Sequence, residues 1–232
     1  MKIALSGVPG FKLGKHNLKD PRLDQAHELV EADKKTHAQV EVVGEEALLE
    51  ADAILATEES KADLILKDLE FVETRLGRDP QPAERAALLK IQALLESERF
   101  MLGGLSPEEL QAVAAHSFYT NKPITVSTAS ELQAPDALLL RAFKEAGYIC
   151  FLTVGGKENR AWPIRSGTTA WEAAGTIHTD IQKGFIRAEI ISFEDFIAAG
   201  GETQAKRAGK QRLETKQYVM QDYDLTNFRF NK

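Results

Sequence analysis

The chain has one cysteine among its 232 residues, so no disulfide can form within it. Cys150 lies between apolar Ile149 and Phe151, and no histidine or basic cluster beside it would lower its pKa, which favours a buried structural thiol. No apolar run approaches the roughly 20 residues that span a bilayer. The opening MKIALSGVPG is too short and too rich in glycine for a secretory signal. We therefore expect a cytoplasmic protein that has no membrane partner.

Composition is otherwise that of a globular protein, with 43% hydrophobic and 28% charged residues. The net charge of −6 divides unevenly, because residues 157–232 carry +2 and the rest of the chain −8. A mildly basic C-terminal part on an acidic body permits RNA contact there. An ordinary solvated surface explains the same charges equally well.

Periodicity predicts an antiparallel helical hairpin over about 60–103. Apolar residues between Leu64 and Leu76 follow the spacing of one helical face, and the sequence DPQP ends this first helix. A second helix runs from Ala83 to Leu102, and a short turn between two helices makes them antiparallel neighbours. Ser106 with Glu109 forms a capping box that opens a third helix, through about His116.

Strand patterns surround this hairpin. Apolar or alternating runs occur at Lys2–Ser6, Gln39–Val43, Asp52–Ala56, Ile124–Thr128 and Tyr148–Thr153, with helical patterns at Asp24–Ala32 and Pro135–Gly147. Strands that alternate with helices indicate an α/β sheet, mainly parallel, from which the hairpin projects as an insertion. Residues 157–232 mix short strands (GFIRAEIIS, YVMQ, NFRF) with short helices, a pattern that suits a small mixed sheet packed on a helix.

A loop with features of a phosphate-binding loop follows the first strand. A working loop has the form G-x-x-x-x-G-K-[ST] between a strand and a helix, with backbone amides around the phosphates and Ser or Thr on Mg²⁺. Here Gly7 and Gly14-Lys15 mark the two ends, with Gly10 between them, but six residues separate the glycines instead of four. His16 stands where the Mg²⁺ ligand belongs. An ordinary surface loop is the alternative.

The segment from Phe151 onward carries the most specific resemblance, through FLTVGGKENRAWPIRSGTTAWEAAGTIHTDIQKGFIRAEIISFEDF and the residues after it. It closely resembles the C-terminal TGS-type domain of the Obg-like ATPase (YchF) family, which implies a β-grasp arrangement. The likeness is good over residues 61–103 and patchy before them. It implies a reduced P-loop-like α/β domain over 1–153 and a TGS-like β-grasp domain over 154–232.

Other nucleotide motifs of that family are altered as well. Asp20-Pro21-Arg22-Leu23-Asp24 resembles a motif that the family places much further downstream of the phosphate loop. Gly44-Glu45-Glu46-Ala47 stands in place of the Asp-x-x-Gly turn, and Thr128-Ala129-Ser130-Glu131 in place of the base-reading Asn-x-x-Glu. Glu131 remains, but a Thr hydroxyl replaces the amide that makes two hydrogen bonds. Phosphoryl transfer depends on positioning and Mg²⁺, so these changes argue against hydrolysis.

The C-terminal part contains the candidate contacts for a nucleic acid or a protein partner. An exposed aromatic beside arginine can stack on an unpaired base, which draws attention to Trp162 between Arg160 and Arg165, although a small domain also needs aromatics in its core. His178 with nearby Asp180 lacks further metal ligands and a nucleophile, so we assign it to partner contact and predict neither a metal site nor a catalytic residue. A basic stretch completes the set: Lys206, Arg207, Lys210 and Arg212.

Three functions remain open from the sequence. The first is a non-hydrolysing relative of the Obg-like ATPases that binds RNA, the ribosome or a translation-linked protein, with no cofactor and no reading of DNA sequence. The second is a weak ATP- or GTP-binding protein, or a nucleoside triphosphatase, with a rearranged loop that includes Gly10, Gly14 and Lys15, with Glu131 near the base and little dependence on Mg²⁺. The third is a protein-binding adaptor that uses an exposed apolar stripe of the hairpin.

Overall fold

The structure, a computed structural model, describes residues 1–231 and divides the chain into two compact units. Unit 1 comprises Met1–His16 and Val40–Ala146, and unit 2 comprises Asn17–Gln39 and the chain from Gly147 onward. Unit 2 is therefore built from two segments that are far apart in the sequence. No helix within the described residues is long and apolar enough to cross a membrane.

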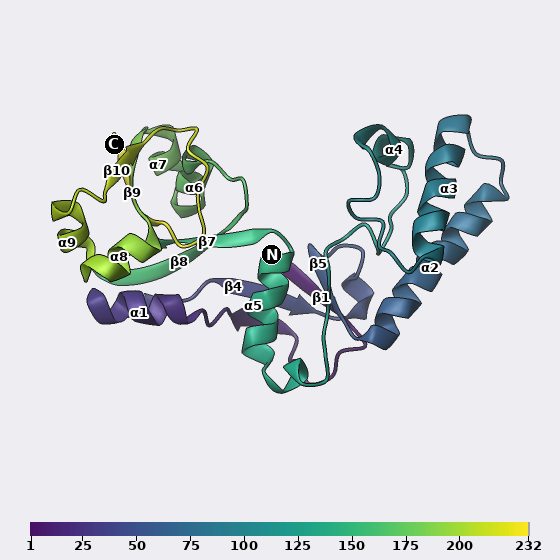
Figure 1. The fold of residues 1–232 in the computed structure, drawn as a ribbon, viewed down its shortest axis with the longest axis horizontal. Helices are drawn as coiled ribbons and strands as arrows, with labels where there is room; N and C mark the ends of the chain where they lie inside the picture. Colours follow the sequence, from purple (N-terminus) through teal and green to yellow (C-terminus); the bar gives the residue numbers. More distant parts are fainter. Residues whose placement is uncertain (232) are drawn as a thin grey trace. The chain divides into compact units, whose positions relative to one another are not determined.

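Unit 1 is built on a sheet with the strand order β2-β4-β1-β5-β6 (Figure 1). The strands are β1 (Lys2–Ser6), β2 (Gly14–Asn17), β4 (Gln39–Val43), β5 (Ala53–Ala56) and β6 (Ile124–Val126). Strands β1 and β4, β1 and β5, and β5 and β6 pair in parallel. Strand β5 is buried along its whole length, because α5 (Pro135–Glu145) packs against β5 and β6. The expected mainly parallel α/β sheet is confirmed.

The helical hairpin of unit 1 consists of α2 (Glu58–Leu76) and α3 (Pro82–Glu96), which lie side by side in Figure 1. Thr57 and Ser60 form a capping box at the start of α2, and Pro82 occupies the first turn of α3, where no amide partner is lost. The two helices enclose their own buried cluster, which includes Ile65, Val72, Leu88, Ile91 and Leu95. The predicted hairpin is confirmed, but its second helix ends at Glu96 rather than at Leu102.

The third predicted helix exists but is shorter than expected. It is α4 (Pro107–Ala112), which packs against α3 and ends before His116. Its capping box is present, with Ser106 Oγ accepting from the amide of Glu109 and the Glu109 carboxylate accepting from the amide of Ser106 at 2.7 Å. Beyond Ala112 the chain turns so that His116 Nε2 lies 2.7 Å from Oε1 of Glu84.

Unit 2 contains a mixed sheet with the order β10-β9-β11-β7-β8-β3. The strands are β3 (Lys34–Thr36), β7 (Tyr148–Thr153), β8 (Glu158–Arg165), β9 (Phe185–Ile191), β10 (Arg212–Glu214) and β11 (Leu225–Phe230). The first and last strands of the C-terminal segment, β7 and β11, are parallel neighbours, while β7–β8 and β9–β11 are antiparallel. With α6 (Ala170–Ile177) between β8 and β9, this is the expected β-grasp arrangement.

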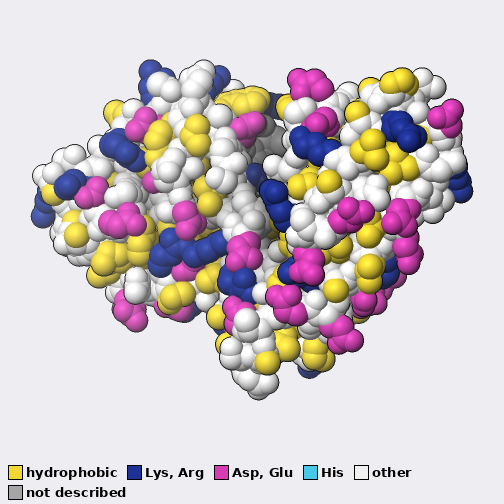
Figure 2. Space-filling view, turned by 45° about the vertical axis from the view of Figure 1, so that its right-hand side comes forward, with side chains coloured by type: hydrophobic (Ala, Val, Ile, Leu, Met, Phe, Trp, Pro, Cys, Tyr) yellow, Lys and Arg dark blue, Asp and Glu magenta, His cyan; other side chains and the backbone are white. Residues whose placement is uncertain are grey.

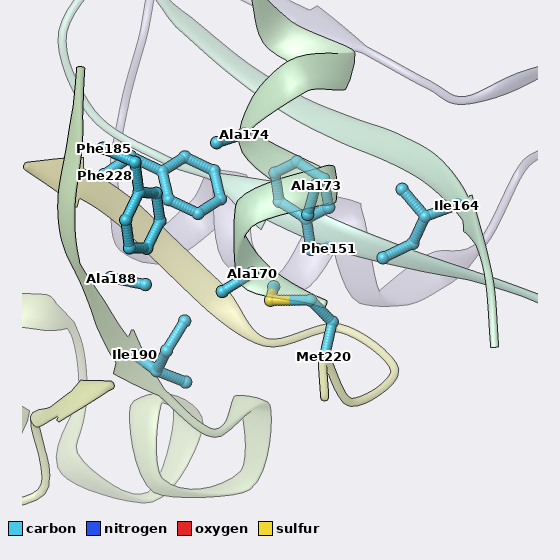
Figure 3. Close-up of a cluster of buried hydrophobic side chains, with 10 residues drawn as sticks. All are labelled: Phe151, Ile164, Ala170, Ala173, Ala174, Phe185, Ala188, Ile190, Met220 and Phe228. Carbon is cyan, nitrogen blue, oxygen red and sulfur yellow. The ribbon is translucent and has the colours of Figure 1, made fainter. Parts of the chain in front are cut away.

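Helix α6 packs closely against one face of this sheet and covers its hydrophobic core. Figure 3 shows three of its alanines, Ala170, Ala173 and Ala174, facing Phe151 and the neighbouring apolar side chains, and all three are fully buried. Small side chains let the helix lie close enough for the aromatic rings of the strands to fill the layer. Phe151 meets Phe228 edge to face at 5.9 Å between ring centroids.

Shorter helices complete unit 2, and one expected strand is missing. The helices are α7 (Thr179–Lys183), α8 (Phe193–Ala199) and α9 (Glu202–Arg207). The run YVMQ, which we expected to form a strand, makes a single bridge between Val219 and Thr169. Two backbone bonds form this bridge: the amide of Ala170 donates to the carbonyl of Tyr218 at 2.8 Å, and the amide of Met220 donates to the carbonyl of Thr168 at 3.0 Å.

The boundary between the units differs from the one we expected after Thr153. Strand β7 pairs with β8 and β11, so it lies in the second sheet rather than the first. Residues 17–39 also belong to unit 2: α1 (Pro21–Leu29) packs on β8 and α8, and β3 extends the sheet in parallel beside β8. The DPRLD motif is therefore part of the β-grasp unit in this chain.

Candidate functional site

The loop from Gly7 to Leu13 joins β1 to β2 in unit 1. Gly7 has a φ of 64°, and a Cβ at this position would lie 3.0 Å from the side chain of Ser60, so the position requires glycine. The amide of Gly7 donates to Oε1 of Glu45 at 2.9 Å. Glu45 begins the 3₁₀ turn Glu45–Ala47 that follows β4. The carboxylate of Glu45 is thus the hydrogen-bond acceptor for the first amide of the loop.

The far end of the loop runs into a strand. Gly14 and Lys15 belong to β2, and the next helix, α1, begins only at Pro21 and lies in unit 2. His16 makes a 2.6 Å hydrogen bond from Nε2 to the carbonyl of Lys12, which uses the side chain within the loop. The helix N-terminus that supplies amides and a positive dipole end to phosphates is thereby replaced by a strand edge.

A shallow hollow of about 260 Å³ lies beside this loop. Its walls are formed by Leu5, Gly7, Val8, Pro9, Gly44 and Glu45. The lining contains apolar side chains and one carboxylate but no lysine or arginine. A phosphate placed there would meet the negative charge of Glu45, which is unfavourable at short range.

Glu131, the predicted base contact, is engaged by its own turn. It lies in the 3₁₀ turn Glu131–Gln133, and its Oε2 accepts from the amide and the hydroxyl of Thr128, each at 2.9 Å. Arg141 Nη2 donates to the same oxygen at 3.1 Å. The Thr128 amide, together with these other groups, holds the pKa of Glu131 below its usual range. The carboxylate is therefore ionised and already holds three donors.

Trp162 and Arg160 form a pair on β8 in unit 2. The guanidinium of Arg160 stacks 3.8 Å above the indole ring, and Trp162 Nε1 donates to the hydroxyl of Thr153 at 3.0 Å. The indole is half-buried and stacks on Phe151 at 6.3 Å between centroids. One face of the ring thus belongs to the core of the domain, and Arg160 covers another part of it.

The remaining predicted contacts of β8 and α7 are each explained locally. Arg165 lies 4.6 Å from the ring centroid of Tyr148 on the neighbouring strand. The exposed His178 is the N-cap of α7, with Nδ1 accepting from the amide of Asp180 at 3.1 Å. Within residues 1–231, no group of three His, Cys, Asp or Glu side chains gathers that could hold a metal ion.

The basic stretch after α8 is largely paired with acids. The ion pairs are Lys206 with Glu202 at 2.6 Å, Lys210 with Asp195 at 3.0 Å, and Arg212 with Glu214 at 3.6 Å. Arg207, in the last turn of α9, is exposed to solvent. Pairing reduces the net positive charge of this surface, so it is weaker as a phosphate-binding patch than the sequence suggests.

One polar cluster of unit 2 was missed by reasoning from the sequence. Arg22 of α1 donates to Oδ2 of Asp20 and to Oδ2 of Asp222, each at 2.7 Å, and its guanidinium lies 3.6 Å from the ring centroid of Tyr223. Asp222 also accepts from the amide of Cys150 at 3.1 Å. This cluster fixes residues 17–39 on the β-grasp sheet. The DPRLD motif was visible, but its partners lie about 200 residues further along the chain.

The sequence is similar to known proteins mainly through this second unit. Residues 148–231 match the family model YchF-GTPase_C, described as a protein of unknown function (DUF933). A relative named ribosome-binding ATPase YchF, from Haemophilus influenzae, is 33% identical over an alignment that covers 73% of this chain and 64% of that protein. The same name belongs to a Bacillus subtilis relative that is 48% identical over 96 residues, or 41% of this chain and 26% of that protein. The chain thus spans less than two thirds of these curated relatives.

A solved structure with the same fold is that of the Schizosaccharomyces pombe YchF GTPase. It has a TM-score of 0.76 at 19% identity, and the superposition covers 99% of this chain and 97% of that one. Identity at this level shows the arrangement of elements only.

Proposed function

Because the chain belongs to the Obg-like ATPase (YchF) family, we propose that it is a ribosome-associated binding protein that does not hydrolyse nucleoside triphosphates. The observation that carries the second half of this proposal is the bond between the Gly7 amide and Glu45. It places a fixed negative charge where the loop would receive a phosphate. The first half is supported by the relatives, which are named ribosome-binding.

Hydrolysis requires Mg²⁺ and a cradle that positions the γ-phosphate. In this chain a strand follows the loop, and His16 donates to Lys12 instead of offering a hydroxyl to the metal. The carboxylate of Glu131 accepts hydrogen bonds from Thr128 and Arg141, which compete with any hydrogen bond from a base. Each feature weakens a different contribution to nucleotide binding, and we expect the losses to add.

Ribosome contact is assigned to unit 2. An unpaired base would stack on the guanidinium of Arg160, which is itself supported by the indole of Trp162. Arg165, His178 and the exposed Arg207 provide further polar contacts on the same unit. Ribosomal RNA is the partner whose unpaired bases and phosphates match this combination.

Two measurements on the purified chain test the proposal. The chain should sediment with ribosomes at about 0.1 M salt and be released as salt rises, because contacts with phosphates are salt-dependent. Trp162→Ala should weaken sedimentation, and Trp171→Ala serves as a control because Trp171 is the other tryptophan and is exposed on α6. Failure to sediment with ribosomes at low salt would refute the ribosome half.

Release of phosphate from ATP and GTP, with and without Mg²⁺, tests the other half. We expect no turnover above the background of the buffer. If the rearranged loop does hold ATP or GTP, its affinity should depend little on Mg²⁺, since no hydroxyl replaces the missing metal ligand. Turnover that requires Mg²⁺ would show that the chain is a nucleoside triphosphatase.

A further inference from the structure

The helical hairpin of unit 1 carries a groove that the nucleotide and ribosome hypotheses do not use. It has a volume of about 430 Å³ and lies between the first turns of α2 and the end of α3. Ile65, Leu69 and Leu95 form its floor, and two of these, Ile65 and Leu95, also belong to the buried cluster of the hairpin. Leu66, at the side of the groove, is 53% exposed. The volume falls within the range of about 300–1,000 Å³ that is common for ligand sites.

The rim of the groove is acidic. Three carboxylates line it, from Glu58, Glu96 and Glu98, against a single ammonium from Lys61. Lys61 already lies 3.4 Å from Glu58, so the carboxylates of Glu96 and Glu98 dominate the opposite side. Figure 2 shows acidic side chains along the lower right margin of the molecule, over unit 1, with hydrophobic side chains exposed between them. An apolar floor inside an acidic rim favours an apolar ligand that carries positive charges around its edge.

Glu98 adds a conformational observation. Its φ is 57°, in the left-handed region that favours glycine, directly after the end of α3 at Ser97. Glycine would fit this position without strain, because it has no Cβ to clash with the following carbonyl. The left-handed residue closes the C-terminus of α3, with the amide of Glu98 donating to the carbonyl of Leu95 at 2.9 Å and that of Arg99 to the carbonyl of Leu94 at 3.0 Å. This cap places the Glu98 carboxylate on the groove rim.

We propose that this groove binds a short amphipathic helix of a partner protein, with leucine-like anchors on the floor and lysine or arginine residues against the acidic rim. A groove between two helices, with apolar side chains in its lining, suits the helix-in-groove mode of recognition, in which anchors recur every three or four residues. The rim repels nucleic-acid phosphates and anionic lipid surfaces, which excludes these two occupants by charge. The proposal is independent of the ribosome contact assigned to unit 2.

The test uses the full chain and a defined probe. The probe is a fluorescein-labelled synthetic peptide of about 15 residues, with leucine on one helical face and lysine on the other, and binding is followed by fluorescence anisotropy. A matched peptide with glutamate in place of lysine should bind at least tenfold more weakly. Equal binding of the two peptides would overturn the role of the acidic rim.

Variants locate the binding site on the hairpin. Glu98→Gln should weaken binding of the lysine peptide about two- to fivefold, the range for one exposed charge pair. Glu70→Gln, the same change on an exposed residue of α2 that does not line the groove, should leave affinity unchanged. Leu66→Ser should weaken binding about tenfold or more, as expected for an apolar anchor contact. Leu89→Ser, at an equally exposed position of α3 outside the groove, is its control.

Two results would overturn the proposal. One is an affinity that falls equally for the groove variants and their controls, which would place the peptide elsewhere. The other is a dimer in sedimentation velocity that Leu66→Ser converts to monomer, which would make a second copy of this chain the occupant.

Discussion

Replacing Arg22 with alanine should destabilise unit 2 strongly. Arg22 bridges Asp20 and Asp222 and stacks on Tyr223, so the substitution removes a cation that two carboxylates share. The side chain of Asp20 is 5% exposed and that of Asp222 is 32% exposed. In the variant, the Asp20 carboxylate is therefore a buried charge, whereas that of Asp222 is partly solvated.

The expected magnitude follows from this difference in exposure. Breaking a fully buried ion pair costs about 3–5 kcal/mol, whereas an exposed pair is worth about 0–1 kcal/mol. With one buried and one partly exposed carboxylate, and a cation–π contact worth about 0.5–1 kcal/mol, we expect a loss of about 2–3 kcal/mol in the free energy of unfolding. For a urea m-value near 2 kcal/mol/M, the midpoint should fall by roughly 1–1.5 M.

Tryptophan fluorescence in urea measures this unit selectively, because Trp162 and Trp171 are the chain's two tryptophans and both lie in unit 2. Arg207→Ala, an exposed arginine of the same unit, should change the free energy of unfolding by less than about 0.5 kcal/mol. Arg22→Lys keeps the charge but not the planar fork, so it should fall between wild type and alanine. An Arg22→Ala variant as stable as Arg207→Ala would refute the view that this cluster holds residues 17–39 on the sheet.

Three further predictions test other parts of the chain. Burial, with the hydrogen bond to Asp224, raises the pKa of Tyr218 to about 12, so the folded state retains this proton more strongly than the unfolded state. Its contribution to stability should be complete below about pH 10 and lost as the pH rises toward 12, and Tyr218→Phe should flatten that part of the curve of unfolding free energy against pH. Glu98→Gly should leave the free energy of unfolding unchanged or raise it by up to about 1 kcal/mol, because glycine adopts the left-handed conformation without strain. Circular dichroism in urea measures this change, and a decrease of about 1 kcal/mol would show that the position is not strained. Glu45→Gln should increase the affinity for ATP about two- to fivefold, because it removes the negative charge at the Gly7 amide. Calorimetric titration measures this affinity, and an unchanged value would show that the Glu45 carboxylate does not exclude phosphate.

Much of the local structure could be predicted because its signals act within a few residues. The Ser106–Glu109 capping box started α4 as expected. The apolar spacing from Leu64 to Leu76 predicted α2, although Leu66, assigned to its apolar face, is 53% exposed. The alternation in Gln39–Val43 marked β4. The spacing between Gly7 and Gly14 predicted a loop other than the standard form, and in the structure this loop leads into strand β2.

What each element pairs with was decided only by the tertiary structure. Strand β7 has the same apolar composition as a strand of either sheet, and its pairing with β11 depends on residues more than 70 positions away. The predicted strand at Val219 is limited to a single bridge with Thr169, because Thr169 is the N-cap of α6 and its chain continues as a helix.

The candidate site divides in the same way. The sequence determined that the chain has a lengthened loop, a histidine at position 16 in place of the Ser or Thr that binds Mg²⁺, and a β-grasp unit of the YchF type. Only the folded chain brought Glu45 onto the Gly7 amide, docked Arg22 between Asp20 and Asp222, and placed Glu98 on the rim of an apolar groove. The physical reason is range: capping and periodicity are properties of neighbouring residues, whereas a carboxylate finds its donor through the path of the whole backbone.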